Sequence, residues 1–336
     1  MSEFRHPRPD ESPVQDTDTD EPVERAPSEV LVIGGGGFIG SHLVDRLVAE
    51  RVSIDVVDDL SSGSLANLAD ARNSARLTGA EMRIHTVDAG AAELGNLISL
   101  RRPRQIVHLA LLPPGRTTPA DLGRSFSSML TALEAARLAA VTKVVVLLPA
   151  TVMYGQPAAR ELPIKEIPIV PRGVRGVVAK AIIDLLTVYR ERHGIEFTAL
   201  AASTVFGSRQ RQSRGVVATL LQAAAQGEPA RLTGDGRQTR DFVFVDDVVD
   251  AIMRARQRGS GLVVNVGTGV QTSLRDLATL INSGGPKPTF VAERPDELMR
   301  FSVSPVRARI HLGWAPWTSL ADGLAAIAAT RDPHGR

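Results

Sequence analysis

Gly34-Gly-Gly-Gly37-Phe-Ile-Gly40 separates a short apolar run, Val30–Ile33, from a segment with apolar residues at helical spacing, 38–50. Its glycines follow the spacing G-x-x-G-x-x-G. Glycines at such a turn let the backbone approach a pyrophosphate closely, and the N-terminus of the following helix offers free N–H groups. The stretch therefore predicts a strand, a phosphate-binding turn and a helix, which together begin a dinucleotide-binding α/β unit.

The same alternation of strand and helix continues along the chain. We expect further strands at 53–57, 82–87, 105–109, 143–148 and 197–201, and helices at 122–140 and 174–192. Apolar strands that alternate with helices are typical of a parallel sheet covered on both faces. The predicted fold class is therefore α/β, a doubly wound parallel sheet of the Rossmann type with a smaller C-terminal substrate lobe.

Composition divides the chain into three parts. Residues 1–28 are rich in Pro, Asp, Glu, Ser and Thr with little to bury, which predicts a disordered acidic tail. Residues 29–206 form the expected dinucleotide-binding domain. Residues 207–330 contain many Arg, Gly and Pro in short segments, which indicates a substrate-binding lobe, and strand-like 262–266 is expected to return to the main sheet.

An acidic residue indicates which dinucleotide the turn would hold. Asp58 ends the second expected strand, where a carboxylate can bond both ribose hydroxyls. Asp59-Leu60-Ser61 contains no Arg that could pair with a 2′-phosphate, so NAD is favoured over NADP. Asp88 ends the third strand and could meet the adenine edge. The alternatives are a glycine-rich turn without a ligand and a simple strand-end cap.

Overall composition excludes several other classes of protein. The absence of cysteine rules out disulfides, thiolate metal sites and cysteine nucleophiles, and we expect no metal site. The formal net charge of +2 gives no indication of nucleic-acid binding. No apolar run reaches the ~18–20 residues of a membrane span, and residues 1–26 do not resemble a signal peptide. The expected location is the cytoplasm, with no membrane partner.

Motifs along the chain resemble one known family. Gly34–Leu47, Val57-Asp-Asp-Leu-Ser-Ser-Gly63 and Val107-His-Leu-Ala110 are similar to the extended short-chain dehydrogenase/reductase family, within which the nucleotide-sugar epimerases (UDP-glucose 4-epimerase-like), dehydratases and decarboxylases are closest. Gly234-Asp-Gly-Arg-Gln-Thr-Arg-Asp-Phe-Val-Phe-Val-Asp-Asp-Val248, Val264-Asn-Val-Gly-Thr-Gly269 and Leu312-Gly-Trp314 extend the resemblance. It spans about Val30 to Ala329.

The resemblance implies ligands and residues that would bind them. The substrate would be a nucleotide-diphosphate sugar, held at its diphosphate by Arg240 and Arg294, with Arg211 in addition and Thr204 where the family usually has Asn. Surface arginines in solvent are the alternative. A homodimer would form through helices 122–140 and 174–192. The residues expected around NAD are Gly34, Gly37, Phe38, Ile39, Gly40, Asp58, Asp59, Ser61, Ser62, Gly63, Asp88, Ala89, Leu109, Ala110 and Lys180.

The family's catalytic group of Ser or Thr, Tyr and Lys is incomplete. Lys180 stands in the Lys position, but Gly176 replaces the Tyr four residues earlier and Ala150 replaces the Ser. Strand alternation predicts that Thr151 points away from the site. Tyr154 could be a substitute base, although packing at the strand end is the more ordinary role. Without the phenol and the hydroxyl, proton transfer worth about 10²–10⁴-fold is missing.

Three functions fit these observations. The first is an NAD-dependent nucleotide-sugar epimerase, dehydratase or decarboxylase that transfers hydride at the sugar C4 despite its degenerate triad. The second is a pseudoenzyme, a non-catalytic binder of NAD and nucleotide sugar that acts as a sensor or as the partner of an active paralogue. The third is a reductase of a non-nucleotide substrate, which the paired arginines disfavour because a small ketone needs no diphosphate clamp.

Overall fold

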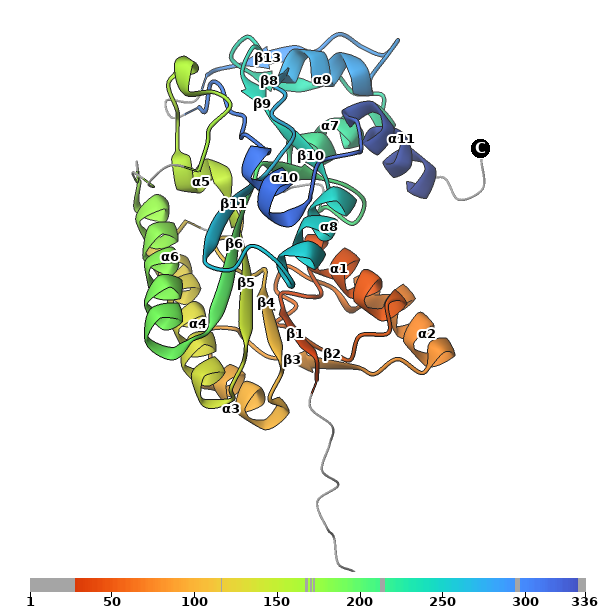
Figure 1. The fold of residues 1–336 in the computed structure, drawn as a ribbon. Coiled ribbons are helices and arrows are strands. Elements are labelled where there is room, and N and C mark those ends of the chain that lie inside the picture. The colour runs from red at the N-terminus through yellow and green to blue at the C-terminus, as the bar shows by residue number, and fades with distance from the viewer. Residues whose placement is uncertain are drawn as a thin grey trace, which may run out of the picture.

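The computed structural model describes residues 28–115, 117–166, 169, 171, 173–211, 215–293 and 297–331. A seven-stranded parallel sheet with the order β11-β6-β5-β4-β1-β2-β3 forms its centre (Figure 1). The strands are β1 (Val30–Ile33), β2 (Ile54–Asp58), β3 (Met82–Thr86), β4 (Gln105–His108), β5 (Lys143–Pro149), β6 (Glu196–Ala202) and β11 (Leu262–Val266). The order reverses between β1 and β4, which confirms the predicted doubly wound fold and places ligands at this switch point.

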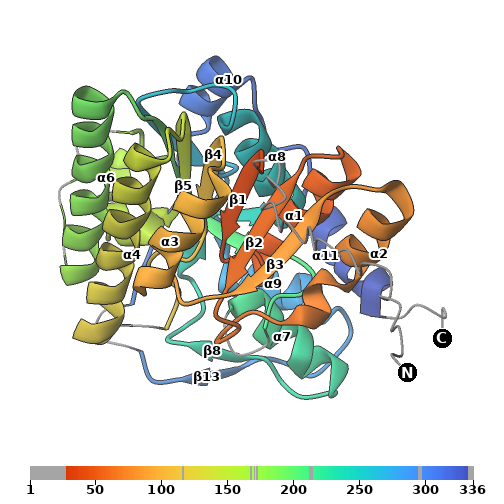
Figure 2. The same cartoon turned by 90° about the horizontal axis from the view of Figure 1, so that it is seen from below.

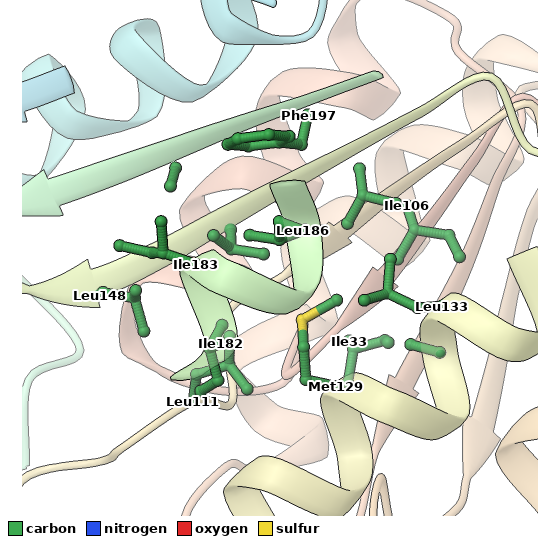
Figure 3. Close-up of a cluster of buried hydrophobic side chains, with 14 of the residues drawn as sticks. Ile33, Ile106, Leu111, Met129, Leu133, Leu148, Ile182, Ile183, Leu186 and Phe197 are labelled. Carbon is green, nitrogen blue, oxygen red and sulfur yellow. The ribbon is translucent and has the colours of Figure 1, made fainter. Parts of the chain in front are cut away.

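Helices cover both faces of this sheet (Figure 2). One layer consists of α3 (Ala92–Arg101), α4 (Pro119–Leu138) and α6 (Val174–His193); the other contains α1 (Phe38–Ala49), α2 (Ala69–Thr78) and α8 (Val245–Ala255). Alternate residues of each strand serve the two layers. Leu31 and Ile33 pack under α3, α4 and α6, where Figure 3 shows Met129, Leu133 and Leu186. Their strand neighbours Val30 and Val32 pack under α1 and α8.

A smaller lobe lies beyond the carboxyl ends of the strands. Its strands pair as β7 (Thr204–Phe206) with β10 (Phe242–Phe244), β9 (Thr239–Arg240) with β12 (Thr272–Ser273), and β8 (Arg231–Thr233) with β13 (Thr289–Val291). Its helices are α7 (Val216–Ala225), α9 (Leu274–Ile281) and α11 (Leu320–Arg331), and α10 (Val306–Leu312) lies beside β11. A separate aromatic core with Phe206, Phe242 and Phe244 holds the lobe together.

Local sequence explains where the elements around the site begin and end. The Thr118 hydroxyl caps α4 by accepting a hydrogen bond from the Asp121 backbone N–H, and the Asp121 carboxylate accepts one from the Thr118 N–H. Gly194 ends α6 in the left-handed conformation that glycine adopts without strain. β5 ends at Pro149, and a short helix, α5 (Ala150–Tyr154), follows at once. The predicted acidic tail lies outside the described residues except for Ser28.

Candidate functional site

A cavity of about 460 Å³ opens at the carboxyl ends of the strands, between the sheet and the smaller lobe. Thirteen of the residues expected around NAD line it, and Gly63 and Lys180 are not among the lining residues. The thirteen are Gly34, Gly37, Phe38, Ile39, Gly40, Asp58, Asp59, Ser61, Ser62, Asp88, Ala89, Leu109 and Ala110. Ser203, directly after β6, also lines the cavity, and the lobe contributes residues 204–205, 209–211 and 215. One cavity therefore joins the glycine turn to the candidate substrate lobe.

The glycine turn is closed so tightly that side chains cannot replace its hydrogens. A Cβ on Gly40 would lie 2.1 Å from the Gly34 carbonyl oxygen and 2.7 Å from the Gly35 Cα. Gly34 has a φ of +84° and lies against Ala110 of the β4 loop. The N-terminus of α1 borders the cavity at Gly37 and Gly40, and a helix N-terminus with glycines beside it suits a diphosphate.

Asp58 connects the turn to the end of β2. One carboxylate oxygen accepts the Gly36 N–H at 2.9 Å, and the other accepts the Leu60 N–H at 2.8 Å. Burial raises the pKa of Asp58 above its ordinary value, although these backbone donors oppose the shift. Each oxygen keeps a further lone pair for a ribose hydroxyl. The turn, the carboxylate and the cavity beside them fit the adenosine half of NAD.

Asp88 also lies at the cofactor side of the cavity, where it is paired with an arginine. One of its oxygens accepts the Gly90 N–H at 2.8 Å, and the other forms an ion pair with Arg124 of α4. Both side chains line the cavity. Asp59 turns its carboxylate to the Ser61 N–H and hydroxyl instead. An adenine at this end would therefore meet an acid–arginine pair rather than a lone carboxylate.

The reacting end differs from the arrangement that strand alternation predicts. Because β5 ends at Pro149, Ala150 begins a helix and is buried in the core cluster under α6. Thr151 is among the residues that line the cavity, beside Leu148 and Pro149, whereas Ala150 is not. The prediction that Thr151 points away assumed that the strand continues to this residue, but the chain is already helical here.

Neighbouring backbone lies close to Gly176, which stands at the position of the missing tyrosine. A Cβ on Gly176 would lie 3.1 Å from the Val152 carbonyl oxygen and 3.3 Å from the Pro171 Cα. One turn later, the Lys180 ammonium donates to Asp184 at 2.6 Å, and 44% of its side chain is exposed. The structure thus pairs Lys180 within its own helix, and its role at the nicotinamide ribose stays a prediction.

Two other ionisable groups near this end are buried and unsuited to proton exchange. The Tyr154 hydroxyl donates to Asn265 Oδ1 at 2.8 Å, and burial raises the pKa of Tyr154. His108 is fully buried, and its burial lowers its pKa to about 3. His108 Nδ1 accepts the Ala110 N–H, so its Nε2 proton is directed to Ser128. Both side chains support the walls of the site.

Arg175 stands directly before Gly176 and braces the loop that follows β4. Its Nη2 group donates to the carbonyls of Leu112 at 2.6 Å and Pro113 at 3.2 Å, two residues that line the cavity. Burial lowers the pKa of Arg175. Its buried Nε has no hydrogen-bond partner within the part of the chain that the structure describes. The first turn of α6 therefore carries a wall-supporting arginine.

The candidate substrate arginines are dispersed. Arg240 forms an ion pair with Glu297 at 2.8 Å and donates to the Leu298 carbonyl, and it is not among the residues that line the cavity. Arg294 lies outside the described residues. Thr204 and Arg211 do line the cavity, and the Arg211 guanidinium donates to the Gly63 carbonyl at 3.3 Å.

Several lining residues were not predicted from sequence. Ser203 stands at the end of β6, and its buried hydroxyl has no hydrogen-bond partner within the described ranges. Its place beside Thr204 was a usable signal, since side chains at carboxyl ends of parallel strands gather at the switch point. Arg124 and Arg209 had no comparable signal, because they are single arginines in an arginine-rich chain.

Comparison with known proteins agrees with this fold. Residues 30–267 match the model of the NAD dependent epimerase/dehydratase family. The chain belongs to this family, and its cofactor is NAD.

The chain is also similar to individual relatives and solved structures. The chain is 39% identical to a UDP-glucose 4-epimerase of Mycolicibacterium smegmatis over 88% of this chain and 96% of the relative. A crystal structure of the UDP-glucose 4-epimerase of Thermotoga maritima with UDP-glucose superposes with a TM-score of 0.83 at 30% identity, over 90% of this chain and 99% of that one. The crystal structure of the UDP-glucose 4-epimerase of Thermus thermophilus with NAD superposes with a TM-score of 0.79 at 26% identity, over 91% of this chain and 99% of that one. These proteins place the chain among the nucleotide-sugar epimerases of the extended short-chain dehydrogenase/reductase group.

None of the helices within the described residues combines the length and apolar character needed to cross a membrane. No three His, Cys, Asp or Glu side chains in those ranges come together in a way that could hold a metal ion.

Proposed function

We propose that this chain holds NAD and a nucleotide-diphosphate sugar in one cavity and transfers hydride at the sugar C4. The observation that supports this most directly is the continuous lining, which runs from the glycine turn and Asp58 to Thr151 and Thr204. The adenosine half would lie at the turn, with the diphosphate on the N-terminus of α1. The nicotinamide would extend toward Thr151, where it supplies the hydride acceptor.

The reacting end supports slow rather than fast chemistry. Loss of hydride from C4 requires the 4-hydroxyl to lose its proton, and the family would use its Tyr for this step. Here Thr151 is the hydroxyl available to orient the 4-hydroxyl, and a threonine cannot hold the proton itself. Water must therefore take it, so we expect turnover about 10²–10⁴-fold below that of a complete triad.

A two-part experiment tests this function. Isothermal calorimetry measures the affinity of the purified chain for NAD and, with NAD present, for UDP-glucose. Each of UDP-glucose, UDP-galactose and UDP-glucuronate is then incubated for hours, with chromatography for sugar products and absorbance at 340 nm for NADH. Thr151→Val should remove most of any turnover. The matched variant Thr131→Val changes a helix residue outside the cavity lining and should leave the rate unchanged.

A second candidate function is a non-catalytic binder of the same two ligands. The packing of Gly176 against Val152 and Pro171, together with the Lys180–Asp184 pair, favours it. Calorimetric binding of NAD and a UDP-sugar, combined with no product from any sugar in the panel, would decide for this function. No binding of NAD by the unmodified chain would end both proposals.

We further propose a homodimer through α4 and α6, which lie side by side on one face of the molecule (Figure 2). Val177 and Val188 on α6 are 56% and 48% exposed, and Leu138 on α4 is 68% exposed. A two-fold axis would bury these side chains against their copies. Light scattering should report a dimer that Val177→Glu dissociates, while the control Leu77→Glu on exposed α2 leaves it intact. A monomeric unmodified chain would contradict this proposal.

A further inference from the structure

The segment Ser208–Arg211, here called the strap, crosses from the lobe to the dinucleotide-binding domain. The Ser208 carbonyl lies 3.1 Å from His42 Nε2 of α1. Arg209 forms ion pairs with Asp45 of α1 at 2.6 Å and with Asp70 of α2 at 3.2 Å. These contacts hold the strap over the cofactor side of the cavity, which Arg209 and Arg211 both line.

Arg211 differs from its neighbour in having no acidic partner. Arg209 is matched by two carboxylates, whereas Arg211 forms no ion pair with any residue in the described ranges. Its one hydrogen bond within those ranges goes to a neutral acceptor, the Gly63 carbonyl, at 3.3 Å. A guanidinium that lines a cavity without a counter-charge can neutralise an anionic ligand there.

The position of Gly63 places Arg211 relative to the glycine turn. A Cβ on Gly63 would lie 2.7 Å from the Gly36 carbonyl carbon and 2.8 Å from Asp58 Oδ1. The next residue, Ser64, donates its N–H to the Gly36 carbonyl at 3.0 Å. Gly63 is thus packed on the glycine turn itself. Because Arg211 donates to Gly63, its charge lies beside the turn rather than beside Arg240, which pairs with Glu297 outside the lining.

We propose that Arg211 binds the diphosphate of the dinucleotide, so that a residue of the substrate lobe contributes to cofactor binding. This inference rests on the proposed binding of NAD, and it assigns Arg211 to the cofactor instead of the sugar nucleotide. Both ligands carry a diphosphate, and the guanidinium recognises that chemistry in either. The strap holds the arginine in place: Arg209 anchors it to α1 and α2 with its own charge already balanced.

Calorimetry on the 336-residue chain distinguishes NAD from UDP as the source of the diphosphate. The Kd for NAD is measured at low and moderate salt for the unmodified chain, Arg211→Ala, Arg211→Lys and Arg237→Ala, and the Kd for UDP is measured in parallel. Arg237 is a lobe arginine with a 78% exposed side chain, so its variant controls for general loss of positive charge. Melting temperature and circular dichroism verify that each variant is folded.

We expect Arg211→Ala to weaken NAD binding about tenfold, which corresponds to about 1.4 kcal/mol, and to leave the Kd for UDP unchanged. The NAD affinity of Arg211→Lys should lie between those of the unmodified chain and Arg211→Ala, since lysine keeps the charge but loses the planar fork of donors. The tenfold difference should shrink as salt rises, because salt screens exposed charges. Arg237→Ala should match the unmodified chain for both ligands.

Two results would overturn the inference alone: an unchanged NAD affinity in Arg211→Ala, or a loss of UDP affinity with NAD binding intact. The latter would return Arg211 to the sugar nucleotide. Failure of the unmodified chain to bind NAD is a different outcome, because it would remove the proposed function and, with it, this assignment.

Discussion

The two ends of the cavity are built on different principles. At the glycine turn, backbone groups from Gly34 to Gly40 form the binding surface, and Asp58 is held by two backbone N–H groups. At the reacting end, the surface depends on individual side chains, and those that the family would use are replaced. Thr151 lines that end where Ala150 was the expected slot, and Gly176 is packed against backbone.

This difference shows which part of a site tolerates change. A backbone cradle is lost only when the chain path changes, and the seven-stranded sheet determines that path. A catalytic side chain can be lost in one substitution, after which neighbours close over the gap. Here the Val152 carbonyl and Pro171 lie against Gly176. In this fold, the residues that bind the dinucleotide can therefore be retained when the side chains for proton transfer are lost.

The sharpest test of the backbone end is Gly40→Ala. Its new methyl group would lie 2.1 Å from the Gly34 carbonyl oxygen, and backbone atoms cannot move aside cheaply. We expect NAD affinity by calorimetry to fall more than about 100-fold, or about 2.8 kcal/mol, with a lower melting temperature. Gly123→Ala, in α4 with nothing within 4 Å of its Cβ, should retain affinity and gain up to about 1 kcal/mol of stability. Normal NAD binding by Gly40→Ala would refute the backbone account.

Gly176→Tyr tests whether the reacting end can simply be refilled. Its Cβ would already press on the Val152 carbonyl and on Pro171, so overpacking should cost about 1–3 kcal/mol of unfolding free energy. The variant should not restore epimerisation on its own, and Gly176→Tyr with Ala150→Ser should remain slow because Ala150 is buried in the core. Denaturant unfolding and product chromatography measure both effects. Fast turnover by the double variant would mean that the slot is open.

Predictability from sequence follows the same division. The expected β1 and the start of α1 agree with the structure to the residue, since β-branched residues and glycines restrict the backbone locally. The end of β5 was predicted to within one residue, but the start of α5 directly after it was not, because nothing in Leu148-Pro-Ala-Thr distinguishes a continuing strand from a helix. Strand alternation therefore does not apply at Ala150 and Thr151, of which Thr151 borders the cavity. Contacts made across the fold, such as Arg175 with Leu112 and Arg211 with Gly63, depend on distances that no local pattern carries.

Asp58 should make the affinity for NAD depend on pH. Burial raises the pKa of this carboxyl above its ordinary 3.8, and only the ionised form can accept from both ribose hydroxyls. NAD affinity should therefore be full at neutral pH and should fall as the pH drops through that raised pKa. Asp58→Asn should bind NAD about tenfold more weakly at pH 7, or about 1.4 kcal/mol, with a flatter profile between pH 7 and 4.5. Parallel profiles for the two proteins would show that another group controls the affinity.

The smallest expected effect on NAD affinity and turnover comes from Tyr154→Phe, which tests whether the phenol of Tyr154 takes part in proton transfer. The Tyr154 hydroxyl donates to buried Asn265 Oδ1 at 2.8 Å, so its removal leaves an unsatisfied acceptor and should cost about 1–2 kcal/mol of stability. NAD affinity and any turnover should not change, since burial raises the pKa of this hydroxyl and directs it away from exchange with a ligand. Tyr189→Phe is the matched control, because the chain has only two tyrosines and Tyr189 donates to exposed Glu134. A loss of turnover in Tyr154→Phe that exceeds its loss of stability, with Tyr189→Phe unaffected, would make Tyr154 the proton-transfer group and the reacting end a relocated catalytic site rather than a closed one.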